Sequence, residues 1–435
     1  MRTSGRLADG PGDRGLYGDG PVAHDSPLRA LRAAPGHTLF EYMAEAPLAD
    51  AGEADPDLVI LANAHPGRLE KSIQRAREML PDRIWDALRA SRAFLVLDAS
   101  TEGAEAEAGV VEPLHGFLAE TGVAAERAIY VTQDRLFEAD YARRCAAQGT
   151  RPGFSVLVFD YWQRALLDSF AGRGRKIHDR RLERYRARAP RRSRRFLSLN
   201  LTLRPSKLAF LTSILKDGLW DAGHISVGSF DQQAAKGKGA EARREGFLED
   251  PSFGPLARQL RPELDRLEAL GEILLGDGSG SRTRDGRPKF TDDAQLPEYD
   301  DCWFSVVTET EMRRVASRIT EKPFKPIANF HPFLVLGNPG ALDLLRRLGF
   351  QTFEGLFDEA YDQEPDPRRR FDMVYGQVLA LCRCDEAELA RRAQAASEAV
   401  EFNAAHLLTR LPVSCREEID RPFMKQLRDL MARAG

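Results

Sequence analysis

A chain of 435 residues is longer than one hydrophobic core usually serves, so two domains are the first expectation. The formal net charge of −3 argues against a general attraction to nucleic acid, and no apolar run approaches the roughly 20 residues that span a bilayer. The sequence opens without the apolar segment of a signal peptide. Five cysteines, with no second pair to match Cys382 and Cys384, argue against zinc and for reduced thiols in a cytoplasm.

The first domain is predicted over residues 36–171. Residues 1–35 precede it as a disordered tail, because they are rich in Gly, Pro, Arg and Asp without periodicity. Short apolar runs at 57–63, 93–98, 128–132 and 155–159 alternate with helical patterns at 69–90 and 111–121. Strands that alternate with helices predict a Rossmann-like parallel sheet covered on both faces.

An Arg-rich segment at 172–194 interrupts this pattern and is predicted to be an inter-domain linker. Together with Arg195 it carries about a dozen Arg and Lys, with Asp179 and Glu183 between them. A patch for nucleic acid, or a peripheral contact with an acidic membrane surface at its inner face, is the alternative interpretation. No aromatic platform accompanies the charge, which favours a solvated helix or linker.

A second Rossmann-like domain is predicted over residues 195–390, followed by C-terminal helices at 391–435. Apolar runs at 195–200, 224–229, 302–308 and 332–337 are expected strands, and 205–216 and 341–348 are expected helices. Residues 350–353 are expected as a short strand, and 231–250 and 276–297 as loops. The terminal helix could brace the first domain. The predicted class is therefore α/β, with two Rossmann-like domains facing a cleft and a helical C-terminal segment.

The stretch 317–340 combines a polar cluster, a short helical segment and a buried strand. Thr320, Glu321, Lys322 and Lys325 come first, and Pro332-Phe-Leu-Val-Leu-Gly337 is the strand. Backbone N–H groups and lysines at such a place can bind phosphate, while a carboxylate can accept from ribose hydroxyls. An ordinary junction with solvated charges is the alternative.

Three segments together resemble a family. They are Phe196-Leu-Ser-Leu-Asn-Leu-Thr-Leu-Arg-Pro-Ser-Lys-Leu208, Thr320-Glu-Lys-Pro-Phe-Lys-Pro-Ile-Ala328 with the strand after it, and Leu348-Gly-Phe-Gln-Thr-Phe353 with Phe357-Asp-Glu-Ala-Tyr-Asp362. Over about residues 195–375 the chain resembles GT-B glycosyltransferases, in particular fucosyltransferase-like and exostosin-like bacterial and viral enzymes. The resemblance implies a hexosyl- or deoxyhexosyltransferase of glycan biosynthesis. Its partners would be a nucleotide-sugar donor and a glycan, lipid-linked or protein acceptor bound by the first domain, and no metal or other cofactor is expected.

The resemblance also assigns the donor site. Glu321 would bind the ribose, and Lys322 or Lys325 a phosphate. The loop at Asn200, Arg204 and Lys207 would face the diphosphate, although relatives often have Arg or His-Arg where this chain has Pro-Ser-Lys. Arg204 is the firmer phosphate contact, since its fork binds two oxygens. The expected donor-binding residues are Asn200, Arg204, Lys207, Glu309, Thr320, Glu321, Lys322 and Lys325.

An inverting transfer would need a base in the first domain to deprotonate the acceptor hydroxyl. Glu102 and Asp98, on the loop after the second strand, are the expected catalytic residues, with His115 a third candidate and a loop cap the alternative for Asp98. Glu309 and Glu311 could instead hold sugar or base, or be solvated. Two other functions stay open: an inactive binding protein with the same fold, and a nucleic-acid-binding protein acting through residues 173–195.

Overall fold

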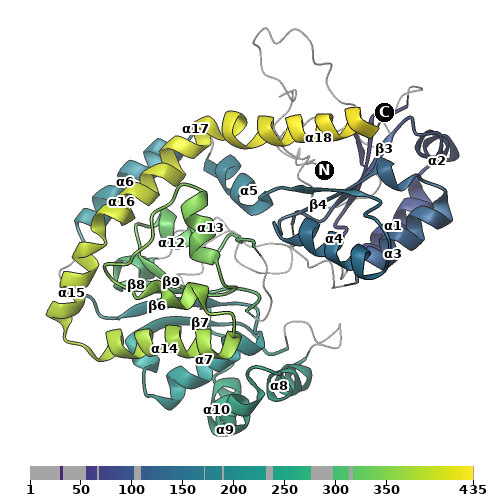
Figure 1. Cartoon of the computed structure of the whole chain (residues 1–435). Helices are drawn as coiled ribbons and strands as arrows, with labels where there is room; N and C mark the ends of the chain where they lie inside the picture. The colour runs from purple at the N-terminus through teal and green to yellow at the C-terminus, as the bar shows by residue number, and fades with distance from the viewer. Residues whose placement is uncertain are drawn as a thin grey trace, which may run out of the picture. The chain divides into compact units, whose positions relative to one another are not determined.

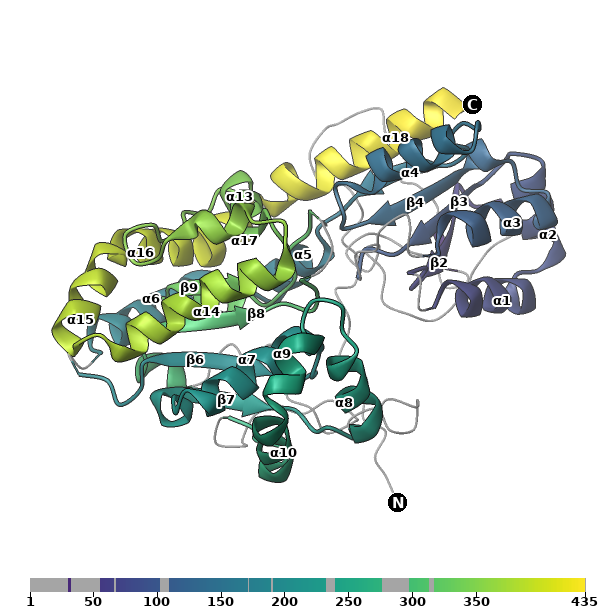
Figure 2. The same ribbon diagram turned by 60° about the horizontal axis from the view of Figure 1, so that its bottom comes forward.

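The computed structural model describes residues 30–32, 55–65, 68–101, 109–170, 172–188, 191–231, 239–275, 297–312 and 317–434 (Figures 1 and 2). The chain is an α/β protein with two Rossmann-like units and a helical C-terminal segment. The first unit comprises Met1–Tyr161 and Glu417–Gly435, and the second comprises Trp162–Arg416.

The sheet of the first unit is parallel, and its strand order follows the chain: β1-β2-β3-β4-β5. Its strands are β1 (Ala30–Arg32), β2 (Leu58–Ala62), β3 (Phe94–Asp98), β4 (Ala128–Thr132) and β5 (Ser155–Val158). Right-handed crossovers between strands in sequential order place the connecting helices on one face. Those helices are α1 (Leu69–Met79), α2 (Asp82–Arg89), α3 (Val111–Thr121) and α4 (Phe137–Ala147).

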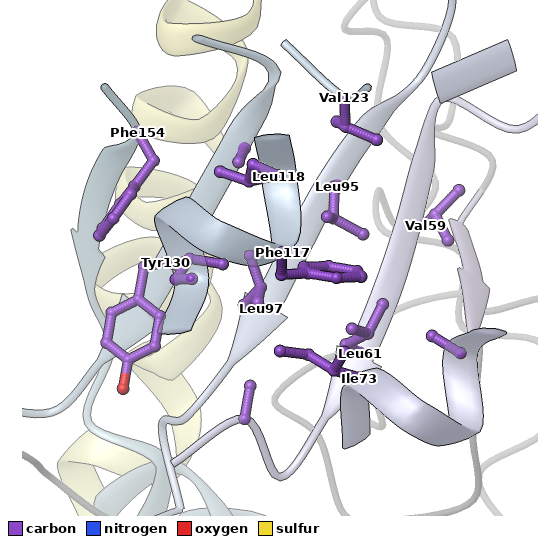
Figure 3. Close-up of a cluster of buried hydrophobic side chains, with 14 of the residues drawn as sticks. Val59, Leu61, Ile73, Leu95, Leu97, Phe117, Leu118, Val123, Tyr130 and Phe154 are labelled. Atoms are coloured by element: carbon purple, nitrogen blue, oxygen red, sulfur yellow. The ribbon is translucent and has the colours of Figure 1, made fainter. Parts of the chain in front are cut away.

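One core lies between these helices and the sheet, and alternation along the strands selects its residues. Figure 3 shows the cluster with Val59 and Leu61 of β2, Leu95 and Leu97 of β3, Tyr130 of β4, Ile73 of α1, and Phe117 and Leu118 of α3. The terminal helix α18 (Arg421–Ala434) also belongs to this unit, where the ring centroid of its Phe423 lies 4.9 Å from that of Phe159.

The sheet of the second unit is also parallel, in the order β7-β6-β8-β9. Its strands are β6 (Phe196–Asn200), β7 (Gly223–Val227), β8 (Phe304–Thr308) and β9 (Phe333–Leu336). Helix α7 (Pro205–Lys216) follows β6, and every residue from Ser206 to Leu215 is buried. The short helix α12 (Phe324–Ala328) precedes β9, and α13 (Ala341–Arg347) follows it.

The C-terminal segment consists of α14 (Pro367–Arg383), α15 (Glu386–Ala395), α16 (Ser397–Ala405) and α17 (Leu411–Cys415). These helices are joined to one another and to α18 partly by π-helical turns.

The Arg-rich segment differs from the expected linker. It forms α6 (Gly174–Arg186) within the second unit, and the unit boundary falls between Tyr161 and Trp162, after the first residue of α5 (Tyr161–Phe170). Arg181, 6% exposed, donates to the carbonyl of Ala328, and Arg188 donates to those of Asn329 and Phe330. Several of these arginines therefore hold the backbone around α12, a use that sequence charge does not reveal.

Four further expectations need correction. Residues 30–32, placed in the tail, form edge strand β1, in which Leu31 is buried. Residues 231–250, expected as a loop, contain α8 (Ala240–Leu248), which α9 (Gly254–Gln259) and α10 (Arg261–Leu270) follow. Helix α8 has no apolar stripe, because Phe247 is its one buried residue. Residues 350–353 form no strand, and Phe350 and Phe353 are buried by aromatic contacts instead. The segment 391–435, expected as one part, divides between the two units at Arg416.

Candidate functional site

The strand order of the second unit reverses direction at β6. The chain passes from β6 to β7 on one side and then returns to β8 on the other side of β6. In open parallel sheets, ligands bind outside the carboxyl ends of the strands at such a reversal. The residues that follow β6 and β8 at this edge therefore define the candidate site. In the first unit, the described strands run in sequential order without a reversal.

A buried polar network follows β8. The hydroxyl of Thr320 donates to Glu309, with Oγ1 lying 2.7 and 2.8 Å from the two carboxylate oxygens. Lys322 donates from Nζ to Oε2 of Glu309 at 3.3 Å, to Oγ1 of Thr320 at 3.1 Å and to Oγ1 of Thr310 at 3.2 Å. Glu309 is only 8% exposed. The predicted donor-binding residues Glu309, Thr320 and Lys322 thus form one hydrogen-bonded group.

Glu321 lies beside this group, with Oε1 3.5 Å from Nζ of Lys322. Burial acts to raise the pKa of the Glu321 carboxyl, but the charges of Lys322 and Lys325 outweigh it, and the pKa falls below its usual value. Burial acts to lower the pKa of Lys322, and the carboxylates Glu309 and Glu321 raise it above its usual value. Both side chains are therefore charged at neutral pH.

Two residues that were not expected in the site support the strand end beside Glu309. A Cβ at Gly337 would lie 3.0 Å from both Cβ and Cγ of Glu309, so the glycine lets the strand end pack directly against this side chain. Arg370 of α14 is 1% exposed and donates to the carbonyl of Gly337 at 2.8 Å. It also donates to the carbonyl of Met312, on the loop after β8. The role of Gly337 could have been predicted, because a glycine directly after an apolar strand often marks a close approach of the backbone. No pattern in the sequence indicates the role of Arg370.

The start of α7 is the second side of the site. Arg204 is the N-cap residue and exposed, Pro205 occupies the first turn, and no side chain caps the helix. Lys207, one turn in, is 3% exposed. Burial, together with the charge of Lys322, lowers the pKa of Lys207 to about 7. Uncapped amides and cations at a helix N-terminus form a site that attracts anions.

Asn200 lies at the end of β6 with no exposed surface. Its side-chain oxygen accepts from Thr308 at 2.8 Å, and its side-chain nitrogen donates to Oγ of Ser198 at 3.0 Å. The side-chain oxygen thus ties β6 to β8, while the side-chain nitrogen bonds Ser198 on the same strand, whose hydroxyl in turn donates to the carbonyl of Val306 on β8. The structure brings Asn200 to the site as a support for the two strand ends.

A small pocket opens at the same edge of the sheet. It is lined by Glu309, Glu311, Arg318, Ile319, Thr320, Pro323, Val335, Asn338 and Ala341. The pocket lies over the ends of β8 and β9, so it adds a concave surface next to the buried network.

The expected catalytic residues belong to the first unit. Asp98 ends β3, is 1% exposed, and accepts from the backbone nitrogen of Ser100 at 2.9 Å and from its Oγ at 2.5 Å. This is the loop-capping role considered as the alternative for Asp98. Glu102 lies outside the described residues. Nε2 of His115 lies 2.6 Å from the hydroxyl of Tyr141, inside the unit. A catalytic role for Asp98 and Glu102 remains a prediction.

Three acidic residues that lie just before strands, Asp55, Asp300 and Asp301, make local contacts. Asp55 pairs with Arg92 at 2.7 Å, and Asp300 with Arg184 and Arg188. Asp301 accepts from Ser193 and lies 2.9 Å from Nε2 of His224.

Across the part of the chain that the structure describes, no group of three His, Cys, Asp or Glu residues could hold a metal ion. In that same part, no helix is long and apolar enough to cross a membrane.

Comparison with known proteins adds one structural likeness. No family model matches the sequence, and no curated protein matches it. Among solved structures, the chain is similar to α,α-trehalose 6-phosphate synthase from Burkholderia multivorans, with 10% identity and a TM-score of 0.39. The match covers 87% of this chain and 70% of the synthase.

Proposed function

We propose that this chain is a glycosyltransferase that moves a sugar from a nucleotide-sugar donor to a hydroxyl acceptor. The observation that carries the proposal is the pairing of two features at the β6–β8 strand reversal. One is the uncapped, cationic start of α7, and the other is the buried network of Glu309, Thr320 and Lys322. A nucleotide diphosphate needs fixed cations and backbone amides, and its ribose needs a carboxylate.

Within this proposal each group has a role. Arg204, the amides of the first turn of α7, and Lys207 bind the diphosphate and stabilise the charge that develops as the glycosidic bond to it breaks. Glu321, which is ionised, accepts from the ribose hydroxyls. Lys322 and Lys325 keep the site positive, and the Glu309–Thr320 contact holds Lys322 in place.

The acceptor half of the reaction belongs to the first unit. A carboxylate there, Asp98 or Glu102, would remove the proton from the acceptor hydroxyl as the new bond forms. Asp98 already accepts two hydrogen bonds from Ser100, so Glu102 is the better candidate. We propose a hexosyl- or deoxyhexosyltransferase that works without a bound metal, in the cytoplasm.

The proposal is tested by screening donors with the purified full chain. Binding and hydrolysis of UDP-, GDP-, CMP- and dTDP-sugars are measured for the wild type, Arg204→Ala and Glu321→Ala. Arg266→Ala is the matched control, because Arg266 is exposed on α10. One class of donor should bind, and both site variants should weaken its binding at least tenfold while the control does not. Failure of every donor to bind or turn over would refute the proposal, and binding without turnover with any acceptor would favour the inactive binding protein.

A further inference from the structure

Lys207 differs from the other buried lysine of the site. Lys322 has three hydrogen-bond acceptors, one of which is the carboxylate of Glu309. Lys207 is 3% exposed, and within the described part of the chain no hydrogen-bond or ion-pair partner contacts its Nζ. A buried ammonium without a partner is costly, so the free protein keeps this side chain poised between its neutral and charged forms.

The groups around Lys207 explain this balance. Burial has the largest effect on its pKa, and the cations Lys322 and Arg204 also lower it, whereas Glu309 and Glu321 raise it. Neither carboxylate is free to compensate, because Glu309 is held by Thr320 and Lys322, and Glu321 lies against Lys322. The resulting pKa of about 7 leaves the amine close to half protonated at neutral pH.

The position of Lys207 in the fold indicates that its partner is an anion bound at the start of α7. It is the third residue of the 12-residue helix α7, at an N-terminus that no side chain caps. The positive end of the helix and Arg204 favour an anion at this point. Because the charge of the N-cap residue Arg204 already acts on the pKa of Lys207, an anion bound beside Arg204 would act on it with the opposite sign and stabilise the charged amine.

We propose that Lys207 takes up a proton from solvent when an anionic diphosphate binds at the start of α7, so that ligand binding and protonation are one coupled event. No bond of the ligand breaks in this step; the proton joins the lone pair of Nζ, and the ammonium then pairs with the diphosphate oxygens. The site thereby favours ligands that carry at least two negative charges. The identity of the anion rests on the proposed function, whereas the coupling rests on Lys207 itself.

Calorimetry tests the coupling directly. UDP-glucose and GDP-mannose are titrated into the full chain at pH 7.5 in HEPES and in Tris, whose ionisation enthalpies differ, since the diphosphate diesters themselves do not titrate near this pH. From a free pKa of about 7, we expect an uptake of roughly 0.5 to 0.8 proton per bound ligand. Lys207→Arg should bind without uptake, because a guanidinium is always charged. Lys216→Met, at the exposed opposite end of α7, should behave as the wild type.

Two results would overturn the inference. One is ligand binding by the wild type with no net proton uptake, and the other is equal uptake by the wild type and Lys207→Arg. If Lys207→Arg does not fold, the ¹³Cε resonance of Lys207 in the wild type gives the same answer. Its titration midpoint should lie near pH 7 without ligand and rise by at least one pH unit with ligand. An unchanged midpoint in the presence of bound ligand contradicts the inference.

Sulfate separates this inference from the proposed function, because it is a dianion that does not titrate near neutral pH. If no nucleotide-sugar binds but sulfate raises the Lys207 midpoint, the coupling stands and the glycosyltransferase proposal fails. If a nucleotide-sugar is turned over while the Lys207 midpoint stays unchanged on binding, the function stands and the coupling fails.

Discussion

Thr320 and Glu309 form a buried contact at the centre of the candidate site's polar network, with the threonine hydroxyl 2.7 and 2.8 Å from the two carboxylate oxygens. They lie 11 residues apart in the sequence and join the loop after β8 to the segment before α12. Since Glu309 is 8% exposed, water can replace little of what Thr320 provides.

Replacement of Thr320 tests this contact. Thr320→Val keeps the shape but removes the hydroxyl, so a buried carboxylate loses a donor. We expect the free energy of unfolding of the second unit to fall by about 1–3 kcal/mol and donor binding to weaken. Thr320→Ser, which retains the hydroxyl, should restore most of both. Denaturation followed by tryptophan fluorescence reports mainly on this unit, because Trp162, Trp220 and Trp303 belong to it. Equal stability of the valine and serine variants would contradict the account.

Gly337 is expected to be needed for the position of Glu309. In Gly337→Ala the new methyl would lie 3.0 Å from two carbons of Glu309, so the carboxylate must shift by a few tenths of an ångström. We expect the KM for the donor to rise several-fold with a smaller change in stability. Gly376→Ala, on the exposed face of α14 with nothing within 4 Å, should instead stabilise the protein by about 0.5–1 kcal/mol. An unchanged KM for the donor in Gly337→Ala would contradict the prediction that donor binding depends on the position of Glu309.

Arg370 should be one of the most sensitive residues of the second unit. Its guanidinium donates to carbonyls of Gly337, Met312, Glu364 and Pro365. Arg370→Met leaves these oxygens without their donor, and we expect a loss of about 3 kcal/mol in the free energy of unfolding. Arg369→Ala, the exposed neighbour on the same helix, serves as the control and should change it by less than about 0.5 kcal/mol. Similar losses in both variants would refute the positioning role.

The titration of Lys207 predicts a pH dependence of stability without ligand. Its pKa is about 7 in the folded chain and near 10.5 when unfolded, so between these values the unfolded chain binds more protons. Stability contributed by this residue therefore rises as the pH increases from about 7 towards 10. Lys207→Met should be more stable than the wild type at pH 6, by on the order of a few kcal/mol, and this advantage should shrink by pH 9.5. A constant difference across this range would mean that Lys207 does not titrate as described.

Acid should weaken the same region through Glu321. The folded pKa of this carboxyl lies below its usual value near 4.5, so its contribution is present above pH 4.5 and is lost as the pH falls through the folded value. Glu321→Gln should remove this part of the acid dependence. Parallel stability curves for the variant and the wild type below pH 5 would contradict the assigned ion pair with Lys322.

Much of the second sheet could be predicted because its strands are short apolar runs that end in turn residues. Helix α7 was predicted at residues 205–216, where it lies, because Pro205 begins it and Asp217-Gly218 follow its end. Helix α8 was missed because its contacts are tertiary: Phe247 is fully buried, and Arg244 pairs with Asp265 and Glu268 of α10. Local pattern cannot show a partner 20 residues away.

The structure brings together several residues that the sequence assigned to the donor site, and their binding role stays a prediction. The sequence pointed to Glu309, Thr320 and Lys322, and the structure joins them in one network. The sequence did not show that the Asn200 side chain is hydrogen-bonded to Thr308 and Ser198. Nor did it show that Arg370, on a later helix, donates to the carbonyl of Gly337 at the end of β9. Both contacts depend on which strands are neighbours in the sheet. The order of the strands along the chain does not determine this.

The central claim is that the start of α7 and the Glu309 network bind a nucleotide-sugar. Its most direct measurement is calorimetric titration of the four donor classes into the wild type, Arg204→Ala and Arg266→Ala. We predict saturable binding of one class by the wild type and Arg266→Ala, and at least tenfold weaker binding by Arg204→Ala. No binding of any class, or equal binding by all three proteins, would contradict the account.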